Sequence, residues 1–301
     1  MRTVLALVPL LLLTAPACGD DSLGNGGQGG GSGTGNSGFG GGGNEFNIGG
    51  SGGGPGGSAG CKRVDLVFSV DNSSSMSEEK EAMASDVFPA FATALLAIGG
   101  GLDDYRIGVL DACPLPAGYL TSGVGGPCNF ASGEVWMNSS DPDLVAEFAC
   151  VGDIDSSASQ CSGDNDDEQP ASTAAASLEP PASTGPNAGF LRDDALLVVV
   201  AITDEDEQPS PTASAQQVHD RLVATKGDVK KLVFLGIGGE SSCNGAYGTA
   251  DQATLMREVA DLFIAEGRGV FWDLCTGQLE DGLDDAMAVI EQACSEFPPP
   301  E

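Results

Sequence analysis

The sequence predicts an α/β fold with a doubly wound, mostly parallel six-stranded sheet flanked by helices. Short apolar runs rich in β-branched residues alternate with longer segments of helical spacing, which is the pattern of successive βαβ units. The two strongest runs, 64–70 (VDLVFSV) and 195–203 (ALLVVVAIT), are apolar almost throughout. Such runs are typical of strands buried on both faces, so helices are expected on both sides of the sheet.

The individual elements follow from the spacing of apolar residues along the chain. Strands are predicted at 64–70, 105–110, 133–137, 195–203, 231–237 and 270–273. Helices are predicted at 77–97, 144–148, 213–224, 250–265 and 279–294, and in the first of them apolar residues recur every four positions. The polar, Pro- and Gly-rich stretches 111–132 and 151–193 are predicted to be loops.

The first residues have the pattern of an export signal. Arg2 is followed by an apolar stretch, 4–13, that is too short to span a bilayer but suits the core of a signal peptide. The next residues, Ala15-Pro16-Ala17-Cys18, resemble the lipobox of bacterial lipoproteins, with Ala15 where leucine is usual. The resemblance implies lipid attachment at Cys18 and a place in the bacterial envelope, at the outer membrane or cell surface. An ordinary signal peptide with a free Cys18 is the alternative.

Composition then divides the chain. Residues 19–60 hold 22 of the 45 glycines, a composition that cannot bury a core. We therefore expect a signal peptide at 1–17, a lipidated cysteine with a disordered Gly/Ser-rich linker at 18–60, a folded domain at 61–297 and a tail at 298–301. The net charge of −32 excludes nucleic-acid binding through a basic patch and leaves the lipid as the expected membrane contact.

The cysteine count also favours export, because an even number remains once Cys18 is set aside. Pairing of neighbours predicts Cys113–Cys128, Cys150–Cys161 and Cys243–Cys275, with Cys61–Cys294 joining the ends of the domain, although spacing does not determine connectivity. A zinc site is disfavoured, since the chain has no CxxC and a single histidine.

Oxygen-bearing side chains follow the two strongest strands. Asp71, Ser73 and Ser75 come after the first, and Asp204 begins an acidic run after the other. In the usual doubly wound order the first and fourth strands are neighbours, so these two loops are expected to face each other. Carboxylates and hydroxyls are hard ligands, which suit Mg²⁺, Mn²⁺ or Ca²⁺.

These motifs resemble those of von Willebrand factor A (VWA) domains. DNSSS at 71–75 matches the DxSxS motif of their metal-ion-dependent adhesion site, TDEDE at 203–207 matches the segment that supplies a distant aspartate, and YRIGVL at 105–110 is similar to the second strand. The resemblance covers roughly residues 62–294. It implies that Ser73 and Ser75 bind a divalent cation through their hydroxyls, that Asp71 and Asp204 bind it directly or through water, and that a partner protein offers a carboxylate to the cation.

One ligand of the family is missing. The site also takes a threonine from a loop between the two motifs, and the corresponding stretch here, 152–169, has none. Asp153, Ser162 or Asp164 would substitute, and a carboxylate there would tighten cation binding and favour Ca²⁺.

Other interpretations remain open. Residues 71–75 could be a helix N-cap, and 204–207 a solvated acidic loop. The fold could also serve as an envelope scaffold with a degenerate site. An enzyme is not expected: Ser73 stands where phosphatases of the haloacid dehalogenase type need an aspartate, and His219, expected at the surface, has no nucleophile partner.

Overall fold

The computed structural model describes residues 61–98, 102, 104–113, 117–155, 168–208, 213–245, 248–277 and 279–297. All belong to one compact unit of the chain, residues 46–301. The predicted signal peptide (1–17), the linker (18–60) with Cys18, the tail (298–301), Cys161, Ser162 and Asp164 lie outside the described residues, so the predictions made for them are not tested.

A six-stranded sheet forms the centre of the domain, in the order β10-β7-β6-β1-β2-β5. The strands are β1 (Arg63–Val70), β2 (Asp104–Asp111), β5 (Met137–Asn138), β6 (Leu196–Ile202), β7 (Leu232–Gly238) and β10 (Gly269–Asp273). All neighbours pair in parallel except β2 and β5, which are antiparallel. Counted along the chain, this is the doubly wound order 3-2-1-4-5-6, which confirms the predicted fold class.

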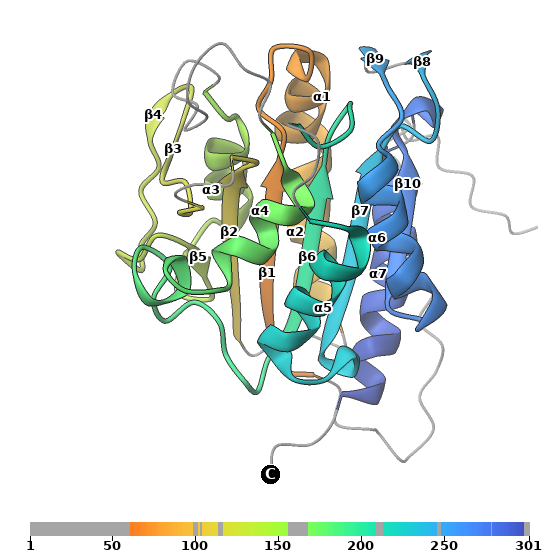
Figure 1. Cartoon of the computed structure of the whole chain (residues 1–301). Coiled ribbons are helices and arrows are strands. Elements are labelled where there is room, and N and C mark those ends of the chain that lie inside the picture. Colours follow the sequence, from red (N-terminus) through yellow and green to blue (C-terminus); the bar gives the residue numbers. More distant parts are fainter. Residues whose placement is uncertain are drawn as a thin grey trace, which may run out of the picture. The chain divides into compact units, whose positions relative to one another are not determined.

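Helices cover both faces of the sheet (Figure 1). One face carries α1 (Ser77–Ala82), α2 (Phe88–Ala97), α3 (Leu144–Gly152) and α7 (Leu279–Glu296); the other carries α4 (Pro170–Ser177), α5 (Ala215–Lys226) and α6 (Thr254–Ala265). The apolar side chains accordingly form two clusters, one on each side of the sheet. In the first, Phe68 of β1 meets the rings of Phe88, Phe91 and Phe148 at centroid distances of 4.9–5.4 Å. The central strands are thus buried on both faces, as their composition predicts.

The predicted helix 77–97 is present but is interrupted by a π segment, Met83–Val87. Pro89 follows directly, in the first turn of α2. A proline has no backbone N–H to donate, and its ring would clash with the carbonyl four residues earlier in a regular α-helix. The wider π turn, in which the Phe88 N–H bonds to the Met83 carbonyl, lets the chain pass this residue without ending the helix.

Several local expectations were wrong. The predicted strand 133–137 is reduced to Met137–Asn138, and the predicted loop 151–193 contains α4. Two short hairpins also occur where no strand was expected: β3 (Ser122–Gly123) with β4 (Gly126–Pro127), and β8 (Cys243–Gly245) with β9 (Gly248–Ala250). His219 is buried rather than at the surface, with Nε2 3.2 Å from Glu266 Oε2 and its ring against Phe263. No helix among the described segments is long and apolar enough to cross a membrane.

Disulfides join segments that are distant in sequence. Cys61–Cys294 and Cys243–Cys275 are confirmed. The predicted pairs Cys113–Cys128 and Cys150–Cys161 are wrong, because Cys128 pairs with Cys150, linking the strand-rich segment after β2 to α3. Cys113 is disulfide-bonded as well, and its partner is none of these six cysteines.

A largely buried ion pair lies at the N-terminal ends of the parallel strands. Asp65 of β1 is fully buried and accepts hydrogen bonds from the backbone N–H and the Nε of Arg192, both at 2.8 Å. The same guanidinium also contacts Asp104 at the start of β2. Burial raises the pKa of Asp65, and the neighbouring Arg192 opposes that rise. The pair therefore ties three neighbouring segments of the sheet together.

We predict that Asp65→Ala lowers the free energy of unfolding by about 3 kcal/mol, because it leaves the mostly buried guanidinium of Arg192, 11% exposed, without its main partner. Arg63→Ala, on the same strand, breaks only an exposed pair with Asp194 and should change stability by less than about 1 kcal/mol. Urea unfolding of both variants checks this. Equal losses would show that burial of the first pair contributes nothing.

Candidate functional site

The two motif loops meet where β1 and β6 end. Val70 pairs with Ile202, so the residues that follow these strands leave the sheet side by side. The Asp71 N–H donates to the Ile202 carbonyl at 2.9 Å, and the Thr203 hydroxyl donates to Asp71 Oδ2 at 2.7 Å. The expectation that the first and fourth strands are neighbours, with their loops facing each other, is confirmed.

The loop after β1 is organised around the carboxylate of Asp71. This side chain is fully buried, and its Oδ1 accepts a 2.8 Å hydrogen bond from the backbone N–H of Ser73, the Asx arrangement that turns a chain sharply. The turn brings the Ser73 and Ser75 hydroxyls within 2.8 Å of each other. A simple N-cap is not what these residues form, since the N-cap of α1 is Met76, which makes no side-chain cap.

Three carboxylates of the loop after β6 make contacts with three different parts of the domain. Asp206 accepts from the Leu255 N–H in the first turn of α6 at 2.8 Å. Glu207 accepts from two backbone N–H groups at the start of α4, at 2.7 and 3.0 Å. Asp204 is turned toward the first loop, where Ser75 hydrogen-bonds to its carboxylate. Asp204 and Glu207 are both buried, so the solvated-loop interpretation is wrong for these two residues.

Asp204 carries an unsatisfied oxygen. Its Oδ1 is buried, and none of the described residues provides a hydrogen-bond partner for it. Burial, together with the nearby charge of Asp71, raises the pKa of Asp204 to about 6. A buried carboxylate oxygen without a donor is costly unless a cation or a proton balances it.

Two charged residues at the start of α1 belong to the same site and were not predicted. Glu79 is buried with its Oε2 unpartnered among the described residues, and burial with the charges of Asp204, Glu78 and Asp71 raises its pKa to about 7. Lys80 donates to Asn72 Oδ1 at 2.8 Å, and burial lowers its pKa. Glu79 lies four residues and Lys80 three residues before Met83, so helical spacing places both on the apolar face of the helix. Two charged residues on that face were the sequence signal that was missed.

Of the three residues predicted to replace the missing threonine, the structure describes Asp153 but not Ser162 or Asp164. Asp153 is the C-cap of α3, and its side chain is exposed. Its charge raises the pKa of Lys80. Its role as a cation ligand stays a prediction. Asp164 lies outside the described residues. Glu168 directly precedes Gln169, the N-cap of α4, and is buried. Its charge also raises the pKa of Lys80. The sequence placed it in a polar cluster, and only the position of α4 brings it to the site.

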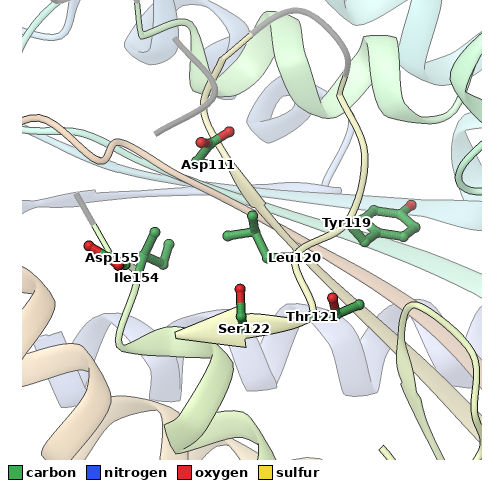
Figure 2. A pocket seen from close by; sticks show the side chains of 7 residues that line it. All are labelled: Asp111, Tyr119, Leu120, Thr121, Ser122, Ile154 and Asp155. Carbon is green, nitrogen blue, oxygen red and sulfur yellow. The ribbon is translucent and has the colours of Figure 1, made fainter. Parts of the chain in front are cut away.

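A polar pocket of about 200 Å³ lies beside the site, at the end of β2 (Figure 2). Its walls include Asp111, Ser122, Ile154 and Asp155, and Figure 2 shows the ring of Tyr119 directed away from the two carboxylates. The carbonyl of Asp155 accepts from Asn72 Nδ2 at 3.3 Å, which joins this pocket to the DxSxS loop. The pocket therefore lies next to the DxSxS loop, although none of the four predicted ligands lines it.

The predicted ligand set contains few carboxylates. Among the described residues no group of three or more His, Cys, Asp or Glu side chains is arranged to hold a metal. The predicted ligands include only two carboxylates, Asp71 and Asp204, and the others are the hydroxyls of Ser73 and Ser75. The structure brings these four together, with one buried carboxylate oxygen unsatisfied.

Comparison with known proteins gives little beyond this. No protein-family model matches the chain, and no curated protein matches it. Among solved structures, proximal thread matrix protein 1 from the mussel byssus is similar at 12% identity and a TM-score of 0.41, over 78% of this chain and 49% of that one. The manganese-loaded TRAP protein of Plasmodium vivax is similar at 12% identity and a TM-score of 0.39, over 78% and 74%. This chain therefore spans about half the length of the mussel protein.

The raised pKa values predict how stability depends on pH without divalent cations. Asp204 and Glu79 bind a proton more tightly when folded than at their ordinary values of 3.8 and 4.5. Their contribution favours the folded state at low pH and is lost as the pH rises through about 6 and about 7. In a chelating buffer, Tm should therefore fall between about pH 5 and about pH 8.

Glu79→Gln and Asp204→Asn should each raise Tm by several degrees at the higher pH and change it little at the lower. Thermal melts of both, beside Glu81→Gln on the exposed side of α1, check this. If all three variants respond alike, general charge reduction in an acidic protein explains the effect, and the buried carboxylates do not.

Proposed function

We propose that this chain is a binding protein that holds a divalent cation at Asp71, Ser73, Ser75 and Asp204 and uses it to grip a carboxylate on a partner protein. The observation that carries the proposal is the buried Oδ1 of Asp204, for which the described residues provide no hydrogen-bond partner. Ser75 hydrogen-bonds to the same carboxylate and also to the Ser73 hydroxyl. The proposal takes the site to be the adhesion site of a VWA-like domain, in agreement with the DxSxS motif and the doubly wound sheet.

The chemistry of these side chains selects the kind of cation. All four offer hard oxygen ligands, which suit Mg²⁺, Mn²⁺ or Ca²⁺. The cation would supply positive charge that accepts an additional oxygen ligand from outside the chain. Asp71 already accepts hydrogen bonds from Ser73 and Thr203, so these two residues hold its carboxylate in one orientation. This orientation supports binding with little rearrangement of the loop.

The proposal includes no bond-making chemistry. The single histidine of the chain, His219, lies on α5 and shares its ring nitrogens with Asp220 and Glu266, as a structural residue would. The partner remains a protein of unknown identity that presents a carboxylate. Because the surface carries a net charge of −32, such a partner would be held by the cation and not by general attraction.

We propose further that the domain is exported and tethered to the bacterial envelope through a lipid on Cys18. Three disulfides among the described residues support export, since such bonds persist in oxidising compartments. The Gly-rich linker between Cys18 and the domain would let the site reach partners away from the membrane.

An envelope scaffold with a degenerate site is the second candidate. It is favoured by Lys80, whose ammonium donates to Asn72 and to the Ser73 carbonyl and brings a positive charge close to Asp71 and Asp204. In that case the loop would be held by the chain's own residues and would bind no metal.

Calorimetric titration of Mg²⁺, Mn²⁺ and Ca²⁺ into the purified protein separates the two. We expect saturable binding at one site, and a loss of affinity of at least about tenfold in Ser75→Ala, which removes one hydroxyl ligand from an exposed position. Asp71→Ala should abolish binding, although it also removes the acceptor of two hydrogen bonds that shape the loop.

Ser74→Ala is the matched control, because Ser74 is exposed in the same loop but is not a predicted ligand. It should bind like the wild type. No saturable binding, or equal binding in all three variants, would mean that the acidic surface merely collects cations, and the scaffold interpretation would then be preferred.

A further inference from the structure

A lysine of α1 hydrogen-bonds to the DxSxS loop, and the proposed cation chemistry does not explain this contact. Lys80 lies one turn into α1 and is 7% exposed, although lysine is rarely buried without a specific partner. Its Nζ donates to Asn72 Oδ1 at 2.8 Å and to the carbonyl oxygens of Asn72 and Ser73, both at 3.3 Å. All three donors of the ammonium are therefore used on two consecutive residues of the loop.

These hydrogen bonds attach the DxSxS loop to α1. Asn72 and Ser73 lie between Asp71 and Ser75, so the ammonium fixes the backbone that carries three of the four proposed ligands. Asn72 is fastened on its other side as well, through its Nδ2 to the carbonyl of Asp155 at 3.3 Å. A compact ammonium on a flexible stem can satisfy two carbonyls and an amide oxygen at once, which a planar guanidinium does less readily.

The position of Lys80 also bears on the charge of the site. Four carboxylates lie close enough to raise the pKa of Lys80 by their charge: Asp71, Glu168, Asp153 and Asp204. A positive charge beneath buried carboxylates offsets part of their mutual repulsion, which is otherwise a cost of keeping them together.

We propose that Lys80 is a positioning residue of the cation site: its ammonium holds the Asp71–Ser75 loop in ligating shape, so that the loop does not depend on a bound cation for its order. This inference rests on the proposed function, since it concerns how the same site is kept ready. Without Lys80, the order of the loop would depend on the cation.

The test measures amide hydrogen exchange of segment 71–76 and Tm, each with a chelator and with saturating Mg²⁺, in the full chain. In Lys80→Met we expect exchange of this segment to speed up by about tenfold or more with chelator and to slow again with Mg²⁺. At the same Mg²⁺ concentration the rise in Tm should be several degrees smaller than in the wild type, because part of the binding free energy is then used to order the loop. Lys80→Arg, which keeps the charge and donors, should restore part of the protection.

Lys226→Met is the matched control for loss of a buried lysine. Lys226 is 8% exposed and donates to the Arg192 carbonyl, near the opposite edge of the sheet, where β6 begins. This variant should lower Tm but leave the exchange of segment 71–76 and the Mg²⁺ increment unchanged.

The outcomes separate the two proposals. Exchange of segment 71–76 that is as slow in Lys80→Met as in the wild type overturns the role of Lys80, and so does an equal Mg²⁺ increment in Lys80→Met and Lys226→Met. A wild-type protein whose Tm does not respond to Mg²⁺, Mn²⁺ or Ca²⁺ overturns the proposed function instead. If Lys80→Met does not fold, Lys80→Gln, which also removes the charge, decides by the same exchange measurement: wild-type protection overturns the role, and faster exchange that slows again with Mg²⁺ supports it.

Discussion

The pairing of β1 with β6 is the constraint on which the rest of the site depends. Because Val70 lies opposite Ile202, the chain leaves both strands at the same height, and Asp71 and Thr203 come into hydrogen-bond contact at once. The loop after β6 then connects this point to the helices on one face of the sheet, through Asp206 at α6 and Glu207 at α4. An error in the β1–β6 register would therefore misplace two helices as well as the site.

The same meeting of loops creates an electrostatic conflict. Burial raises the pKa values of Asp71, Asp204 and Glu79. The charge of Asp71 raises the pKa of both other carboxylates, and the charge of Asp204 raises that of Glu79. Such an arrangement costs stability, and a fold that keeps it usually does so at a place where an outside charge is to be bound. Lys80 offsets a part of this conflict from within the chain. The balance left over is negative, which agrees with a cation as the natural complement.

Much of the sheet could be predicted from sequence because its central strands are apolar on both faces, a pattern that few other structures produce. The short strand β5 and helix α4 could not. α4 reads PASTAAAS, small residues that are buried nearly all round, so it lacks the apolar stripe by which a helix is recognised. That the four predicted metal ligands lie together could be predicted, because they belong to the loops that follow two neighbouring strands. Glu79 and Lys80 reach the same place from the first turns of α1, where two charges on the apolar helix face indicate burial but not a site. Glu168 reaches it through the position of α4, which was not predicted.

The two hairpins show why the edge around the site can be built from long, polar segments. β3–β4 and β8–β9 stand on either side of α1 at the edge where the parallel strands end (Figure 1). Each is anchored at its base by a disulfide, Cys128–Cys150 or Cys243–Cys275, with separations of 22 and 32 residues. Closing such loops covalently removes conformational entropy from the unfolded chain, so little apolar burial is needed to hold them. The hydrophobic core can then stay between the sheet and its two helical layers, and the two hairpins can remain largely polar.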